Sequence, residues 1–192
     1  MLYHQTKKGF ALLLALIISS VVLAIGVSIL HISVNQINLS STARESEFAF
    51  QAAHAGIDCM MYWRSEKSLD FVDTDGTLAN PTINCFAGNP ITTLKRSYVP
   101  FSGAGYVREY INTFEWGSPL RCSQVSMYVI NANGSDDAVV HFSDNRGIGT
   151  NGVKTCSAGT VCTVLISDGY NRACNELDST IFSVQREVVV EY

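Results

Sequence analysis

Proline and charge are both missing from the N-terminal part of this chain of 192 residues. The first proline is Pro81, so no proline interrupts a helix before the late sixties. The span of 21 residues from Phe10 to Leu30 has no charged residue. As an α-helix it would rise about 31 Å, close to the thickness of the hydrocarbon core of a bilayer. The sequence therefore predicts a membrane-spanning segment within one helix that runs from about Phe10 to Arg64.

The sequence also lacks the short motifs of the common enzyme classes. It has no GxSxG, HExxH, GxGxxG or phosphate-binding P-loop pattern. We interpret Glu109 as a strand-face residue and Glu115 as a turn residue, not as a catalytic pair. The sequence therefore predicts no catalytic residues, no enzymatic activity and no cofactor.

Metal ligands do not occur at the spacings that metal sites need. The segment DTDG at 73–76 is similar to the start of a calcium-binding loop, but Phe71 and Thr82 stand where oxygen ligands are required. We interpret this segment as a solvated turn and expect no metal. The four histidines show no ligand spacing, and we expect His54 on the exposed side of the helix; they are His4, His31, His54 and His141.

Basic residues are outnumbered, with 13 Lys and Arg against 17 Asp and Glu. If Lys7 and Lys8 are removed with a leader, 11 basic residues face 17 acidic ones, and the net charge becomes −6. A nucleic-acid surface needs clustered Lys and Arg. The charge balance therefore makes nucleic acid an improbable partner.

Cysteine is absent before Cys59, and no CxxC pair occurs among the six cysteines. An even number in a domain outside the cytoplasm predicts disulfides rather than zinc. Six cysteines allow 15 pairings, and the sequence alone does not select one. Their positions beside the helix end, the predicted strands and a short loop favour the pairs Cys59–Cys85, Cys122–Cys174 and Cys156–Cys162.

The helix carries a wide apolar face in its C-terminal part. One stripe contains Phe48, Ala52, Ala55, Cys59 and Tyr62, and the adjacent stripe contains Ala49, Ala53, Gly56, Met60 and Trp63. This spacing is typical of a helix packed on a sheet, and the small residues would allow a close approach. Nearer the N-terminus, Gly26 and the Ser19–Ser20 pair are places where the helix could bend.

After residue 66 the sequence predicts strands instead of helices. They are Val107–Trp116, Val125–Asn131, Ala138–Phe142, Thr160–Ser167 and Ile181–Glu191. The segment NANGSDD contains Asn-Gly and predicts a hairpin between the second and third strands. A helix followed by consecutive strands predicts an α+β fold, in which an antiparallel sheet packs on the C-terminal half of the helix.

Four aromatic residues occupy even-numbered positions of the first long strand, so we expect their side chains on one face of it, mostly in the core. They are Tyr106, Tyr110, Phe114 and Trp116. The alternative is an exposed adhesive patch.

The leader MLYHQTKKG ends at the junction between Gly9 and Phe10, before the apolar run and not after it. A conventional secretory signal is cut after its apolar region. Cleavage after Gly9 would leave the apolar helix on the mature chain, with Phe10 first. Lys7 and Lys8 precede the apolar run and the next basic residue is Arg44, so the positive-inside rule places the C-terminal domain outside the cytoplasm.

This arrangement resembles the N-terminal region of the type IV pilin superfamily, and in particular PilX-type minor pilins. The segment RESEFAFQAAHAGID is similar to the pattern AFQAAEAG of that family, and His54 stands where glutamate is usual. Matching residues include Phe50, Gln51, Ala52, Ala53, Ala55 and Gly56. The segments GYNRAC and VQREVVVEY also look like the end of some minor-pilin head domains.

The resemblance implies four segments: a leader at 1–9, a transmembrane and filament-core helix at 10–34, its amphipathic continuation at 35–66 and a β-rich head at 67–192. It implies that a prepilin peptidase cleaves between Gly9 and Phe10 and methylates the new amine. The implied partners are other pilin subunits, bound through the helix, and the assembly platform of the inner membrane. The implied location is the inner membrane in a single pass, and then a cell-surface pilus.

Leu14 would be the fifth residue of the mature chain, where most pilins carry glutamate. The absence of this glutamate resembles PilX-type pilins and the tip pseudopilin of type II secretion, and favours a specialised subunit placed at the filament tip. The expected function is that of a minor pilin supporting pilus biogenesis, adhesion or aggregation. The alternatives are a type II secretion pseudopilin and a DNA-uptake or adhesin pilin.

Overall fold

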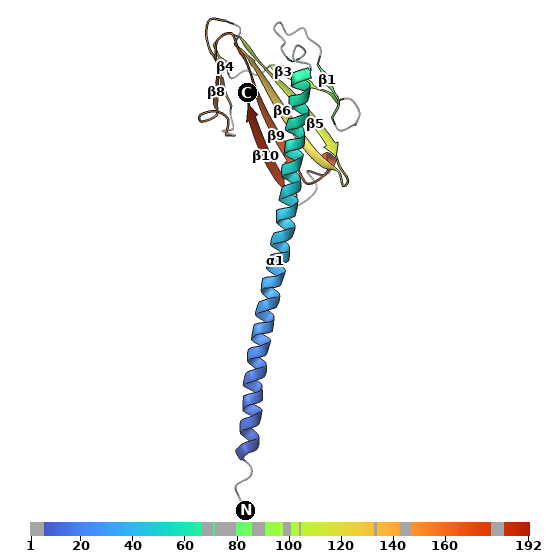
Figure 1. Cartoon of the computed structure of the whole chain (residues 1–192), viewed down its shortest axis with the longest axis vertical. Helices are drawn as coiled ribbons and strands as arrows, with labels where there is room; N and C mark the ends of the chain where they lie inside the picture. The colour runs from blue at the N-terminus through green and yellow to red at the C-terminus, as the bar shows by residue number, and fades with distance from the viewer. Residues whose placement is uncertain are drawn as a thin grey trace, which may run out of the picture. The chain divides into compact units, whose positions relative to one another are not determined.

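The computed structural model of the chain describes residues 6–66, 71, 80–85, 91–97, 101–103, 105–132, 134–142, 147–177 and 183–192. It divides into two compact units, Met1–Arg44 and Glu45–Tyr192. The described part of the first unit is helical throughout. The second unit contains the rest of that helix and the strands (Figure 1).

The helix α1 runs without a break from Thr6 to Glu66, which confirms the single long helix. No proline lies within it, and the positions where it could bend, Gly26 and the Ser19–Ser20 pair, are helical. Its last turns, from Glu45 onward, belong to the second unit.

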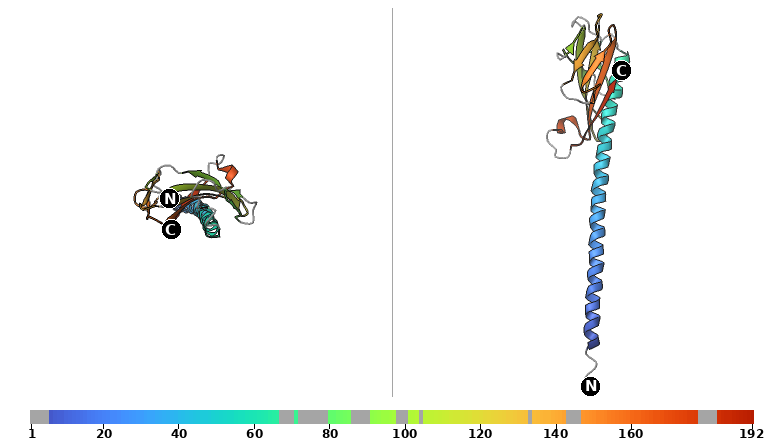
Figure 2. Two further views of the ribbon diagram at one scale, coloured as in Figure 1. Left: turned by 90° about the horizontal axis from the view of Figure 1, so that it is seen from above. Right: turned by 90° about the vertical axis from the view of Figure 1, so that its left-hand side faces the viewer.

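The second unit is built on a five-stranded antiparallel sheet with the order β10-β9-β6-β5-β3. The strands are β3 (Leu94–Ser97), β5 (Tyr106–Trp116), β6 (Arg121–Asn131), β9 (Val161–Tyr170) and β10 (Gln185–Glu191). The C-terminal part of α1 packs on one face of this sheet, and the view from above in Figure 2 shows the strands as a layer with the helix on one side. The α+β fold predicted from the sequence is confirmed.

The sheet is buried on both faces, so this unit has two core clusters. The cluster on the helix side includes Met60, Tyr110, Val125, Met127 and Leu165. The cluster on the opposite side includes Val107, Ile130, Val140, Val164 and Ile166. Alternate residues of β6 enter opposite clusters, because successive side chains of a strand point to opposite faces.

A smaller sheet with the order β4-β7-β8 supplies part of the second cluster. Its strands are β4 (Phe101–Ser102), β7 (Ala138–His141) and β8 (Val153–Cys156). A two-stranded sheet pairs β1 (Thr82–Ile83) with β2 (Ile91–Thr92). The short 3₁₀ helix η1 (Cys174–Glu176) follows β9.

The predicted hairpin between the second and third strands is wrong. β6 pairs with β5 and β9, whereas β7 pairs with β4 and β8. Both edges of β6 are therefore occupied within the larger sheet, and the chain crosses to the other layer before β7 begins. The turn residues of NANGSDD correctly predict where β6 ends, but they do not predict which strands pair with it.

Small residues bring helix and sheet into backbone contact, as expected. A Cβ atom added at Gly169 of β9 would lie 2.1 Å from the Ala53 nitrogen and 2.2 Å from the Ala49 oxygen. The Ser123 hydroxyl donates to the Ala52 carbonyl at 2.6 Å, which ties β6 to the helix backbone. One residue of the predicted face is misplaced: Tyr62 is exposed, whereas Ile57, which the predicted face leaves out, is buried.

Candidate functional site

The first part of α1 presents an uncovered apolar surface. Phe10 is 70% exposed, Leu14 47% and Leu39 72%, and the large apolar side chains between them are exposed as well. The helix is long and apolar enough to cross a membrane by length and composition. An exposed apolar surface of this extent is typical of a segment that binds lipid or other chains, which makes it the first candidate functional site.

The hydroxyl groups on this surface are satisfied within the helix. Ser19 and Ser20 donate to the carbonyl oxygens of Leu16 and Ile17 at 3.0 and 2.8 Å. Further along, Ser28, Ser33 and Thr42 donate to the carbonyl oxygens four residues earlier. Each hydroxyl therefore adds little polarity to the helix surface.

The expected processing point lies at the start of α1. The helix begins at Thr6, so Gly9 and Phe10 fall in its first turn or just beyond it. The first four N–H groups of a helix have no intrahelical acceptor, so this turn can open at the loss of few hydrogen bonds. Gly26, the other glycine of the apolar segment, has no neighbouring side chain within 4 Å of its Cβ position.

All six cysteines are paired in three disulfides. The pairs are Cys59–Cys85, Cys122–Cys174 and Cys156–Cys162, which are the pairs favoured by the sequence. The first joins the end of α1 to the segment after β1, where the Trp63 indole also donates to the Asn84 carbonyl at 2.9 Å. The second joins β6 to η1.

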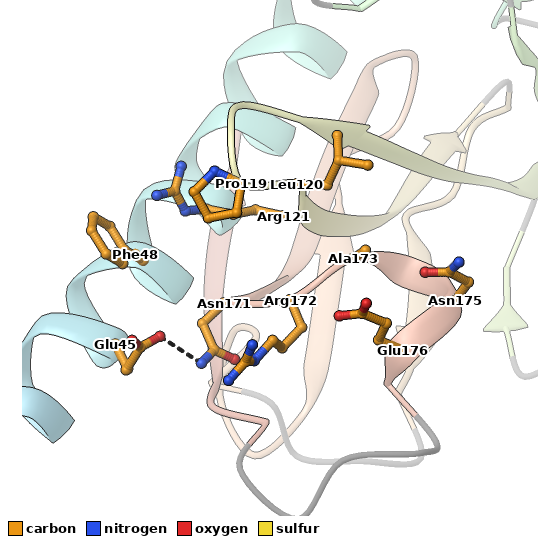
Figure 3. Close-up of a pocket in the computed structure, with 10 residues that line it drawn as sticks. All are labelled: Glu45, Phe48, Pro119, Leu120, Arg121, Asn171, Arg172, Ala173, Asn175 and Glu176. Atoms are coloured by element: carbon orange, nitrogen blue, oxygen red, sulfur yellow. Dashed lines mark hydrogen bonds between the residues drawn. The ribbon is translucent and has the colours of Figure 1, made fainter.

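A groove of about 430 Å³ lies beside the second disulfide. Figure 3 shows its three sides: α1, the turn between β5 and β6, and the segment after β9. Its lining residues are Glu45, Phe48, Pro119, Leu120, Arg121, Asn171, Arg172, Ala173, Asn175 and Glu176. The groove is the second candidate site, because it combines two arginines with apolar side chains.

Arg121 is held at the groove by aromatic rings. Its guanidinium carbon lies 4.2 Å from the centre of the Phe48 ring and 5.6 Å from the centre of the Trp116 ring. A Cβ at Gly117 would approach the Arg121 Nη1 to 3.0 Å, so the glycine leaves room for the guanidinium. Arg121 Nε is buried and has no hydrogen-bond partner within the described residues.

Asn171 fixes the opposite wall of the groove. Its amide nitrogen donates to Glu45 Oε2 at 2.8 Å, and its amide oxygen accepts from the Val184 N–H at 2.9 Å. A second link joins the same part of α1 to β10, because Arg186 Nε donates to the Ser46 hydroxyl at 2.7 Å. These polar contacts hold the first helical turns of this unit against the sheet.

Glu191 and Tyr192 lie at the other end of the sheet. Burial raises the pKa of Glu191, but hydrogen bonds from Lys154 and the Gly149 N–H, with the charge of Lys154, outweigh it and leave the pKa below its ordinary value. The Lys154 Nζ lies 2.6 Å from Glu191 Oε2. Burial raises the pKa of Tyr192, against a smaller opposing effect of the Arg64 charge.

Glu109 and Glu115, which the sequence analysis interprets as non-catalytic, both accept hydrogen bonds within the fold. Glu109 lies on β5, as expected, and accepts a hydrogen bond from the Tyr128 hydroxyl at 2.8 Å. Glu115 is also within β5 and not in a turn, because the strand extends to Trp116; it accepts from the Cys174 N–H at 2.6 Å.

No group of three potential metal ligands comes together among the described residues. The DTDG segment at 73–76 lies outside them. His54 is exposed, as expected, and its ring lies edge-on to Phe50 at 4.4 Å between ring centres. Tyr110 and Phe114 are buried and Trp116 packs beside them, as predicted for a core face of the strand.

The groove was not predicted, although the sequence contains a signal for it. Arg121 adjoins Cys122, and Arg172 lies two residues before Cys174. Pairing these cysteines therefore brings the two arginines to one place. The contribution of Phe48 depends on the helix packing and could not be read from spacing alone.

Comparison with protein-family models, with curated proteins and with solved structures finds no match to the chain. The architecture itself, one long apolar N-terminal helix followed by a C-terminal antiparallel sheet, is compatible with a pilin-like fold.

Proposed function

We propose that this protein is a minor pilin of a type IV pilus. The observation that carries the proposal is the difference in burial along α1. Its first part is apolar and exposed, and its last turns are buried against a disulfide-linked sheet. A single helix of this kind can anchor a head domain in a membrane and later supply the core of a filament. The resemblance of residues 44–58 to PilX-type pilins supports the same proposal.

Assembly in this proposal moves the apolar part of α1 from lipid into a bundle of similar helices. The prepilin peptidase removes residues 1–9, and the platform of the inner membrane extracts the mature chain. The chain supplies the apolar surface and the head, while the partner machinery supplies the energy. The chain itself performs no catalysis in this proposal.

Leu14 supports placement of the chain at or near a filament end. A glutamate at this position can pair with the N-terminal amine of a neighbouring subunit, and a buried amine needs such a counter-charge. Leu14 offers none to a subunit above it. A subunit that caps the filament has no such neighbour to neutralise.

A tip pseudopilin of a type II secretion system is the alternative, because it shares the missing glutamate. A secretion gene cluster beside the gene would favour it. A binding role in DNA uptake or adhesion has less support than either of these functions. The acidic balance opposes DNA binding, and burial of Tyr110 and Phe114 removes two members of the aromatic set that could have formed an adhesive patch.

Intact-mass analysis tests the proposal directly. The full chain is expressed in cells with a prepilin peptidase and purified from membranes. The expected mass is that of residues 10–192 plus one methyl group. A mature chain that begins after residue 24, as a conventional signal would give, contradicts the proposal.

A further inference from the structure

Two arginines, Arg121 and Arg172, line the groove beside the Cys122–Cys174 disulfide. Arg121 packs on the rings of Phe48 and Trp116, and no ion pair or side-chain hydrogen bond of either arginine occurs in the described part of the chain. A guanidinium carries five N–H donors and stays charged at every physiological pH. Arg121 Nε is in addition shielded from water. A partly buried cation with unused donors indicates that an acceptor comes from outside the chain.

Two glutamates also line the groove, so its formal charge is balanced. Their placement differs from that of the arginines. The Glu45 carboxylate accepts from Asn171, and Glu176 is exposed on η1. Among the described residues, neither carboxylate forms an ion pair with Arg121 or Arg172. The carboxylates therefore leave the donors of both arginines available to another molecule.

The rest of the lining restricts the kind of anion. Leu120 is 50% exposed, and Phe48 and Pro119 extend the apolar surface beside the guanidinium (Figure 3). A small hydrated anion gains nothing from these side chains. A carboxylate on a protein segment can pair with the guanidinium in a bidentate manner while its neighbouring carbon atoms cover the apolar wall.

We infer that this groove receives a glutamate or aspartate side chain from a neighbouring pilin subunit. The inference rests on the proposed function, because Glu45 and Phe48 lie on α1 only a few residues beyond the exposed Leu39. The groove is therefore lined by residues that follow the proposed filament-core segment in the same helix. Arg121 supplies the fixed donor group, and Arg172, which is exposed, closes on the carboxylate from the other wall.

Photocrosslinking in filament-forming cells tests the inference with the full chain. A benzoyl-phenylalanine probe at Leu120 reports what enters the groove, and the same probe at Leu94 of β3, 46% exposed, serves as the reference position. We expect the Leu120 probe to crosslink another pilin within a few residues of an acidic side chain. The double variant R121Q/R172Q should lower this crosslink about tenfold or more, as expected for loss of a desolvated charge pair.

The matched control is Arg108→Gln, because Arg108 also lies over an aromatic ring, 5.1 Å from the centre of Tyr106, but outside the groove. It should leave the Leu120 crosslink unchanged. Arg172→Glu alone should lose the crosslink. Replacing the acidic residue of the partner by Lys in the same cells should then restore it. Retention of all three disulfides shows that each variant is folded.

Three results would overturn the inference: a Leu120 crosslink to lipid, a crosslink to a segment without an acidic residue, or a crosslink unaffected by R121Q/R172Q. A chain that is processed and found in filaments but gives no Leu120 crosslink also defeats it, and leaves the proposed function intact. A chain that keeps residues 1–9 and never enters filaments defeats the proposed function itself.

Discussion

Gly169 lies where the sheet comes into close contact with the backbone of the helix. Its missing side chain lets β9 lie against the backbone of Ala49 and Ala53. The helix contributes small side chains to the same contact, and Ser123 adds a hydrogen bond to its backbone. Backbone atoms cannot move aside as a flexible side chain can, so this contact tolerates no added atom.

Gly169→Ala is therefore expected to destabilise the head by about 3 kcal/mol or more, at the upper end of the usual cost of overpacking a core. Chemical denaturation of the full chain in detergent measures the loss. Gly26→Ala is the control, because a Cβ there meets nothing within 4 Å. It should leave the unfolding of the head unchanged, and an equal loss in both variants would contradict the argument.

The Lys154–Glu191 ion pair predicts a pH-dependent contribution to stability. The pKa of Glu191 is lowered from 4.5 in the folded chain. A carboxyl group with a lowered folded pKa stabilises the protein above its unfolded pKa, and the contribution disappears as the pH falls through the folded value. The two side chains are 21% and 23% exposed, so we expect at most about 1 kcal/mol.

Glu191→Gln should therefore lower the free energy of unfolding near neutral pH but have much less effect well below pH 4.5. Denaturation of both proteins at the two pH values measures the difference. An equal effect at both values would show that Glu191 acts through packing instead of charge.

The three disulfides differ in the length of chain that they close. The separations are 52 residues for Cys122–Cys174, 26 for Cys59–Cys85 and 6 for Cys156–Cys162. A longer closed loop removes more entropy from the unfolded chain, so replacing Cys122 and Cys174 by alanine should cost about 2 kcal/mol more than replacing Cys156 and Cys162. Denaturation of the alanine variants tests this order, and peptide mapping that finds Cys85 bonded to Cys174 would contradict the pairing itself.

The long strands could be predicted because each has a clear apolar pattern and a turn signal at its end. β5, β6, β7, β9 and β10 all overlap the predicted segments. Five other strands were missed. All five have only two to four residues, so they are too short to show a period of two; they are β1, β2, β3, β4 and β8.

The pairing of β7 could not be predicted from the hairpin signal. Asn-Gly predicts a turn, but a turn joins two strands into a hairpin only if an edge of the first strand is free. β9, some 30 residues further along the chain, occupies that edge of β6. Long-range competition of this kind leaves no local trace in the sequence.

At the scale of the whole molecule, the missing glutamate predicts where the chain sits in a filament. If Leu14 marks a capping subunit, the protein should be scarce relative to the main pilin and concentrated at filament ends. Leu14→Glu should allow more incorporation along the shaft, because an amine–carboxylate pair removes an unpaired-charge cost of several kcal/mol. Immunogold labelling of sheared filaments measures the distribution.

Leu13→Glu is the matched control for this prediction, since it adds the same charge one position away from the expected partner. It should not increase labelling of the shaft. Uniform labelling along the wild-type shaft would rule out the capping role and leave Leu14 as a tolerated variation.

The candidate sites were predictable to different degrees. The apolar helix surface follows from composition alone, because hydrophobicity acts along the chain. Cleavage between Gly9 and Phe10 stays a prediction. The groove requires Phe48, Arg121 and Asn171 to meet, and these residues come from three distant parts of the sequence. Only the arginines beside Cys122 and Cys174 gave a local indication of it.

The serines and the threonine that bond back to their own helix have a consequence for movement between environments. A free hydroxyl would gain partners in a protein bundle that it lacks in lipid, and would favour one side of the transfer. Here each of these hydroxyls donates to a backbone carbonyl oxygen of its own helix, so its hydrogen bond does not depend on the environment. In the proposed function, the helix would therefore expose nearly the same chemical surface to hydrocarbon and to neighbouring helices, and its hydroxyl groups would favour neither environment.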